Sequence, residues 1–337
     1  MKLKDTMAGF ALYQPANLPD ALALLDKAGP GMWKLAGGND SFGWFKQRIK
    51  QPEAVVDLGG IDELRGIREV SGGVEIGALT TLTDVERSPL IREKYRVLAD
   101  AARGVASPQI RNTGTIGGNA AQDARCPYYR YGLACYRAGG NICFADTPTG
   151  VNRDHALFDT VRCVAASPSD VAPALVALDA RMIVRSAGRE RVLTTDEFFV
   201  GPAKDITRMT SLAPNELLVA IRLPQAWAGC RFYFEKTADR NTWDFPLVNV
   251  AAAIAVDKGV VARARLACGA VSAVPRRLTE AEAVLVGKAP SEALGREAGA
   301  AATRRARPLT YNGYKIPLMA NLVMRAVRDA TGGAGDV

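Results

Sequence analysis

Four of the six cysteines fall within residues 126–163, so a metal or cluster site is the first chemistry to consider. Their separations of 9, 8 and 20 residues include no close Cys-x-x-Cys pair, which zinc sites usually have, and no familiar ferredoxin spacing. Spacing alone therefore leaves iron–sulfur, zinc and unligated thiols open. Arg125, Arg130 and Arg137 lie beside these cysteines in the sequence and would offset the charge of thiolates. The four candidate ligands are Cys126, Cys135, Cys143 and Cys163.

A glycine pair, Gly37-Gly38, stands between a predicted buried strand and a predicted helix. This arrangement aims backbone N–H groups at a ligand, and the helix dipole adds positive potential. Glycine also lets the main chain approach an anion closely. One such pair taken alone is more often a plain turn. The first set of candidate binding residues is Lys34, Leu35, Ala36, Gly37, Gly38, Asn39, Asp40 and Ser41.

A second glycine-rich segment, TGTIGGN, is predicted to be a loop that follows a helix ended by Pro108. Its crowded backbone and hydroxyl donors suit a phosphate or a flavin. Neither glycine segment matches the GxGxxG pattern of a Rossmann site or the GxxxxGK[ST] pattern of a P-loop. If the two segments converge, together they suit a dinucleotide. The second set of candidates is Thr113, Gly114, Thr115, Ile116, Gly117, Gly118 and Asn119.

Composition argues against several classes of function. The single histidine, His155, excludes a catalytic zinc built on two or three histidines of this chain, and is expected to be a surface or locally hydrogen-bonded residue. The net charge of +8 is scattered, without zinc-finger spacing, which disfavours nucleic-acid binding. No apolar run is long enough to span a membrane and the N-terminus does not resemble a signal peptide, so a cytoplasmic chain is expected.

Periodicity predicts how these candidates are positioned. Residues 17–29 predict a helix capped by Asn17, and short strands and helices follow in an α/β pattern. Residues 124–163 show little periodicity, which inside a compact domain usually indicates a functional segment. The last third has strands first and helices after them, which predicts a separate α+β domain. Cys230 and Cys268 lie in predicted strands and are expected to be small core residues.

In their order and separation, these motifs resemble the FAD subunit of the molybdenum hydroxylases, the xanthine dehydrogenase and carbon monoxide dehydrogenase family. LAGGND and TGTIGGN resemble the family's two flavin-binding loops, with Asn39 where Thr or His is usual. SPSDVAPALVAL resembles the segment with an FAD-contacting aspartate, here Asp170, and TADRNTWDFPLVNVAAAI resembles the start of the C-terminal domain. The resemblance implies an α+β / α/β fold: a two-part, PCMH-like FAD-binding domain in residues 1–226 and a smaller α+β domain in residues 227–331.

Relative to most of this family, residues 124–163 are an insertion. Two subgroups have a similar one, the periplasmic aldehyde oxidoreductase and the 4-hydroxybenzoyl-CoA reductase, both with an extra [4Fe-4S] cluster. RCPYYR and the long gap between Cys143 and Cys163 are closer to the first subgroup, whereas Asp123 of QDARC is seen in the second. The resemblance implies that the four cysteines are cluster ligands, and we place Asp123 with the cofactor-binding residues.

The resemblance also implies the function. A large partner would hold molybdopterin and the substrate site, a small partner two [2Fe-2S] clusters, and this chain would pass their electrons through FAD to an external acceptor. No catalytic residue is assigned to this chain, and the complex could be periplasmic if a partner carries a twin-arginine signal. The alternatives are a reductase-like or other heterocycle hydroxylase subunit, a vanillyl-alcohol type flavin oxidase, and a non-enzymatic iron–sulfur or zinc module.

Overall fold

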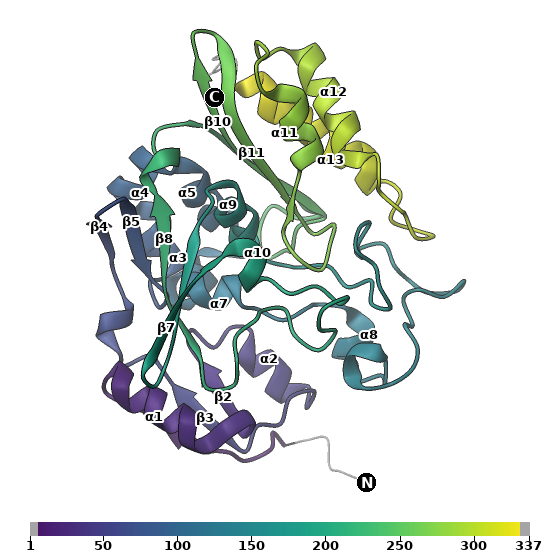
Figure 1. Cartoon of the computed structure of the whole chain (residues 1–337). Coiled ribbons are helices and arrows are strands. Elements are labelled where there is room, and N and C mark those ends of the chain that lie inside the picture. The colour runs from purple at the N-terminus through teal and green to yellow at the C-terminus, as the bar shows by residue number, and fades with distance from the viewer. Residues whose placement is uncertain (1–5, 331–337) are drawn as a thin grey trace.

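The computed structural model describes residues 6–330, which form three sheets with helices packed against them (Figure 1). The first sheet is small and parallel, in the order β1-β3-β2. As predicted, Asn17 caps α1 by accepting a hydrogen bond from the Asp20 N–H at 2.9 Å. The elements are β1 Ala11–Tyr13, α1 Leu18–Ala28, β2 Met32–Leu35, α2 Ser41–Lys46 and β3 Ala54–Asp57.

The second sheet is antiparallel, in the order β4-β5-β8-β6-β7, and its two faces are buried by different partners. Met182 and Val184 of β6 pack in the core with helices α3 to α5, α7 and α9, while Ile183 between them packs in the core that contains α1. This is the alternation of a strand whose period is two. The elements are β4 Ile67–Val70, β5 Gly73–Gly77, α3 Leu82–Arg87, α4 Pro89–Lys94, α5 Arg96–Arg103, α6 Pro108–Thr113, α7 Ile116–Ala120, α9 Val171–Ala177, β6 Arg181–Ser186, β7 Arg189–Thr194, α10 Thr195–Phe198 and β8 Leu217–Pro224.

The third sheet belongs to the C-terminal part and has the order β12-β11-β10-β9. Val250 and Ala252 of β10 pack in the core that contains α11 to α13, whereas Ala251 and Ala253 pack in the core of the second sheet. The strand is therefore buried on both faces. That double burial explains the unbroken apolar run of VAAAIAV. The elements are β9 Arg231–Thr237, β10 Val248–Asp257, β11 Val260–Gly269, β12 Arg276–Arg277, α11 Thr279–Leu285, α12 Glu292–Thr303 and α13 Lys315–Asp329.

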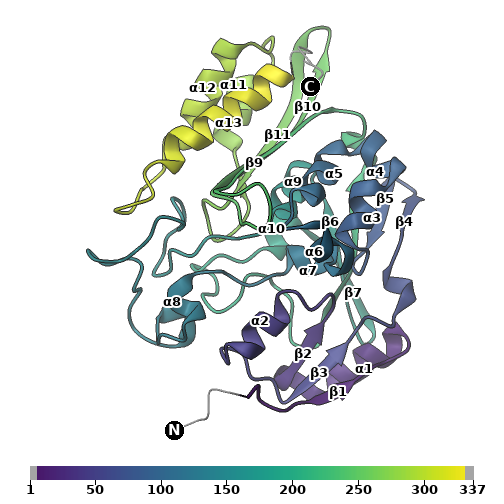
Figure 2. The ribbon, with the colours of Figure 1, turned by 180° about the vertical axis from the view of Figure 1, so that it is seen from behind.

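Residues 124–163 have little regular structure, as predicted: one turn of helix, α8 Pro127–Arg130, and a 3-10 turn, Tyr136–Ala138. Both views show this insertion projecting beside α2 on one side and the C-terminal helices on the other (Figures 1 and 2). The C-terminal part holds its end in place, because Asn312 donates to the carbonyls of His155 and Ala156, each at 3.0 Å. Buried Lys315 donates to the carbonyls of Asp154 and Ala270.

The prediction of one helix from Leu90 to Gly104, ended by Pro108, is wrong. Tyr95 breaks the segment into α4 and α5, and Pro108 is the first residue of α6, capped by the Ser107 hydroxyl. Proline is tolerated at the first helical position because that position needs no N–H donor. Among residues 6–330, no helix is long and apolar enough to cross a bilayer.

Asn312→Ala tests the attachment of the insertion to the C-terminal part. Two buried carbonyls would lose their donor, so we expect the free energy of unfolding to fall by about 1–3 kcal/mol in urea denaturation. Asn215→Ala, which removes a surface hydrogen bond to Asp26, is the control and should change it by less than about 0.5 kcal/mol. An equal effect of both variants would mean that Asn312 does not hold the insertion.

Candidate functional site: a cavity between two glycine segments

The two glycine-rich segments touch each other, although they are far apart in the sequence. A Cβ on Gly37 would lie 2.1 Å from the carbonyl oxygen of Thr113, so only glycine permits this approach. Asn39 strengthens the contact by donating from Nδ2 to Thr113 Oγ1 at 3.0 Å and to the Ile110 carbonyl at 3.3 Å. The convergence on which a dinucleotide site depends is therefore present.

The second segment is not the predicted loop. It is the junction of α6 and α7, where Thr115 Oγ1 accepts from the N–H of Gly118 at 3.1 Å. Gly117 is needed for packing, because a Cβ there would lie 2.8 Å from the Ala78 carbonyl oxygen. Gly114 and Gly118 are the glycines of this segment that face the cavity described next.

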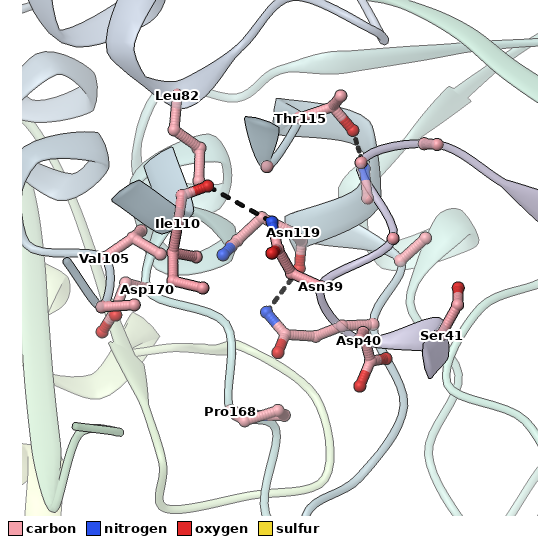
Figure 3. A pocket seen from close by; sticks show the side chains of 18 of the residues that line it. Asn39, Asp40, Ser41, Leu82, Val105, Ile110, Thr115, Asn119, Pro168 and Asp170 are labelled. Carbon is pink, nitrogen blue, oxygen red and sulfur yellow. Dashed lines mark hydrogen bonds between the residues drawn. The ribbon is translucent and has the colours of Figure 1, made fainter. Parts of the chain in front are cut away.

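A cavity of about 340 Å³ opens where the segments meet, and most of the predicted binding residues line it (Figure 3). Leu35, Thr113, Ile116, Gly117 and Asp123 do not. Leu35 and Ile116 are core residues, and Asp123 instead pairs with Arg137. The predicted residues that line the cavity are Lys34, Ala36, Gly37, Gly38, Asn39, Asp40, Ser41, Gly114, Thr115, Gly118, Asn119 and Asp170.

The cavity has an apolar wall that sequence reasoning missed. Leu82, Val105 and Ile110 form part of it, and Trp243 and Phe245 come from the C-terminal part of the chain. Exposed Trp243 also has a left-handed backbone (φ 55°), and strain of this kind concentrates at functional sites. An apolar wall facing glycine backbone suits a ligand with a flat ring system and a phosphate group.

Asp170 lies at the cavity wall and joins the two parts of the chain. Lys236 Nζ donates to its Oδ2 at 2.7 Å, and Asn249 Nδ2 donates to its Oδ1 at 3.0 Å. Burial raises the pKa of Asp170 to about 6, against the opposing effect of Lys236 and Asn249. Lys236 also donates to the carbonyl of Gly104. Sequence reasoning missed these partners, although Asn249 stands out as a fully buried amide within an apolar strand.

The four predicted ligand cysteines gather in the insertion. Burial raises the pKa of the Cys126 thiol to about 11, the N–H groups of Tyr129 and Tyr128 oppose this, and Cys163 and Cys143 raise it further. Burial likewise raises the pKa of Cys163, and Cys143 and Cys135 add to it. Among residues 6–330, however, no group of three or more His, Cys, Asp or Glu side chains could hold a metal ion as placed. The metal site therefore stays a prediction.

His155 was expected to be a surface or a locally hydrogen-bonded residue, and the surface alternative is wrong. It is 3% exposed, and its Nε2 lies 3.3 Å from Cys126 Sγ. Burial and then the charge of Lys315 lower its pKa to about 4, so the ring is neutral at pH 7. Cys268 is a buried core residue of β11, as predicted, whereas Cys230 directly precedes β9 and is only partly buried; all six cysteines are free thiols.

Comparison with known proteins decides the family. The model of the family described as "FAD binding domain in molybdopterin dehydrogenase" matches residues 8–226, well over half of the chain. The chain belongs to the FAD-binding subunits of the molybdenum hydroxylases. A second family model, the carbon monoxide dehydrogenase flavoprotein C-terminal domain, matches residues 233–330. The resemblance and the fold class drawn from the sequence are thereby confirmed, and this flavoprotein subunit is an oxidoreductase component.

Individual relatives agree with this family. The aldehyde oxidoreductase FAD-binding subunit PaoB of Escherichia coli (strain K12) is 35% identical over 281 residues, covering 81% of this chain and 85% of that protein. The carbon monoxide dehydrogenase medium chain of Hydrogenophaga pseudoflava is 29% identical, with 95% and 96% covered. A solved structure of that organism's carbon monoxide dehydrogenase, lacking the Mo-pyranopterin moiety, superposes with a TM-score of 0.77 over 97% of this chain and 98% of that chain.

Gly37→Ala tests the contact between the glycine segments. The new methyl group cannot fit against the Thr113 carbonyl, so the segments must separate and the FAD Kd should rise at least about tenfold. Fluorescence titration of the flavin-free protein measures this. Gly31→Ala, whose Cβ would lie 3.7 Å from its nearest neighbour, should bind FAD like the wild type. Unchanged FAD binding by Gly37→Ala would contradict this site.

Asp170→Ala tests the buried ion pair between the two parts of the chain. Lys236 would be left as an uncompensated buried charge, so the free energy of unfolding should fall by about 3–5 kcal/mol in urea denaturation. The double variant Asp170→Ala/Lys236→Met should regain much of the lost free energy of unfolding. Asp100→Ala, which breaks the surface pair with Arg96, should cost less than about 1 kcal/mol. A small loss for Asp170→Ala alone would refute this role.

Proposed function

We propose that this chain binds FAD in the cavity between the glycine segments and carries a [4Fe-4S] cluster in its insertion, as the electron-transfer subunit of a molybdenum-containing oxidoreductase. The observation that carries the proposal is the arrangement of two neighbouring cavities. A second cavity of about 170 Å³ is lined by Cys126 and His155. It shares Pro168, Asp244 and Phe245 with the glycine cavity, so the cysteine group adjoins the proposed FAD site.

Binding and orientation of FAD are this chain's contribution, since the flavin itself supplies the redox chemistry when it is bound. Gly38 and Gly118 both line the cavity. The N–H groups that follow Gly37 would hold the phosphates, whereas the N–H of Gly118 already donates to Thr115 Oγ1. The apolar wall around Val105 would exclude water from the ring system. No side chain is assigned as an acid, base or nucleophile. The proposed FAD-binding residues are the twelve predicted residues that line the glycine cavity.

We favour a cluster over a single zinc ion for the cysteine group, because the two subgroups that the insertion resembles have a [4Fe-4S] cluster. Cys163 and Cys143 raise the pKa of the Cys126 thiol, and Cys143 and Cys135 raise the pKa of the Cys163 thiol. All four thiols therefore lie in one neighbourhood. Zinc would need its sulfur ligands about 2.3 Å from one atom, and among residues 6–330 no three or more His, Cys, Asp or Glu side chains are placed to hold a metal ion. A cluster several atoms wide would be bound by thiols that are further apart. Arg137 is buried beside Cys163 and would offset part of the thiolate charge.

We propose that the chain works with a large molybdopterin subunit, which holds the substrate site, and with a small subunit carrying two [2Fe-2S] clusters. Electrons from those clusters would reduce the FAD, which an external acceptor reoxidises. The identity with PaoB supports an aldehyde oxidoreductase type, and the aspartate at position 123 leaves a 4-hydroxybenzoyl-CoA reductase type as the second candidate. The proposed compartment is the cytoplasm, or the periplasm if a partner carries the complex across the membrane.

Cys135→Ser tests the cluster. The variant should lose most of its iron and acid-labile sulfide, and its broad brown absorption, while keeping FAD, because the glycine cavity does not include this residue. Cys230→Ser lies outside the group and should keep both cofactors. Wild-type protein that contains zinc and no iron would contradict the cluster. Colourless protein without flavin would contradict the whole proposal and favour a non-enzymatic module.

A further inference from the structure

The wall between the two cavities contains one residue that no motif singles out as a flavin contact, Arg125. It lines both the glycine cavity and the cavity beside Cys126. Among the residues that line the glycine cavity, Lys34 is the other cation. Lys34 donates from Nζ to the carbonyl of Ala213 at 3.0 Å, and burial lowers its pKa to about 8 despite Glu216. Arg125, by contrast, presents a guanidinium with several N–H donors.

The guanidinium of Arg125 is held from two sides. It stacks on the Phe245 ring at 4.7 Å from the centroid, and its Nη2 lies 2.8 Å from Asp40 Oδ1. Asp40 comes directly before α2 at the first glycine segment, and Phe245 belongs to the C-terminal part. Both residues also line the glycine cavity. The cation is therefore fixed at the cavity wall before any ligand arrives, which lowers the entropic cost of using it.

Arg125 retains unused binding capacity. Its Nε is buried and has no hydrogen-bond partner among residues 6–330; Arg130 Nη1 and Arg137 Nε are in the same situation, but those two residues do not line the glycine cavity. A buried donor without an acceptor is costly, and native structures seldom keep one unless something binds there. On the side of the insertion the ion-pair network has more positive than negative charge, while the glycine cavity itself is lined by Asp40, Asp170 and Asp244 as well as by Lys34 and Arg125. Four cations surround two carboxylates here, and the ion pairs are Arg125–Asp40, Arg130–Asp40, Arg137–Asp123 and Lys50–Asp123.

We propose that Arg125 is a cofactor-binding residue that holds the anionic part of FAD at the wall shared with the cysteine group. A guanidinium provides several donors in a fixed plane, which suits phosphate oxygens as well as an anionic ring system. Because Cys126 follows it directly in the chain, the residue that binds FAD also fixes the start of the cysteine group. This inference rests on the proposed FAD site and adds an FAD-binding residue outside both glycine segments.

Arg125→Gln tests the inference by FAD titration of the full chain after flavin removal. Loss of a charged, partly buried donor should raise the FAD Kd roughly 10- to 100-fold. Arg130→Gln is the matched control, because it removes a charge from the same network at 3.8 Å from Asp40 but does not line the glycine cavity. Its Kd should change by less than about threefold. The midpoint potential of bound flavin should also fall in Arg125→Gln, because a positive charge favours the reduced, anionic ring.

The outcomes distinguish a failure of the role of Arg125 from a failure of the proposed FAD site. A wild-type Kd in Arg125→Gln, or an equal rise in Arg130→Gln, would overturn the role of Arg125. If Arg125→Gln fails to fold, Arg125→Lys decides, because it keeps the charge and loses the planar stack. A raised Kd in that variant supports the inference and an unchanged Kd contradicts it. Normal FAD binding by Gly37→Ala would instead contradict the proposed FAD site, independently of the results for the Arg125 variants.

Discussion

The close approach of Gly37 to the Thr113 carbonyl is the contact on which the rest of the site depends. It joins the small parallel sheet to the helices of the second sheet without an intervening side chain. The cavity lies where these two segments meet, and both of them line it. Asn39 fixes the angle between them by bonding across the contact. A larger residue at this point would change the shape of the whole cavity and not only a single contact with the bound molecule.

The insertion is irregular in secondary structure but well anchored. Its first residues meet the glycine cavity through Arg125, and its last residues are bonded by the 312–315 segment of the C-terminal part. Backbone groups that no helix or strand satisfies are thus satisfied by buried side chains, as a buried irregular segment requires. The insertion would otherwise have to rely on a bound cluster for its entire conformation.

The sequence predicted the elements whose signals are local. The Asn17 cap, the strand before Gly37, the irregular insertion and the final helices all depend on neighbours within a few residues. The α6–α7 junction was misjudged because a proline before glycines suggests a stop, whereas Ser107 and Pro108 together begin a helix. Lys236 and Asn249 could not be assigned to Asp170, because their contacts span more than sixty residues. Gly117 was attributed to ligand binding, since a sequence cannot distinguish close packing from close approach to a cofactor.

The double burial of β10 has a further consequence for motion. One face of this strand belongs to the core of the FAD-binding part and the other to the core of the C-terminal helices. A hinge between the two parts would have to pull apolar side chains into water along the whole strand. The C-terminal part therefore behaves as a fixed wall, and the spacing between the glycine cavity and the cysteine group is set when the chain folds. Any opening toward an outside molecule must come from a surface loop and not from movement of whole domains.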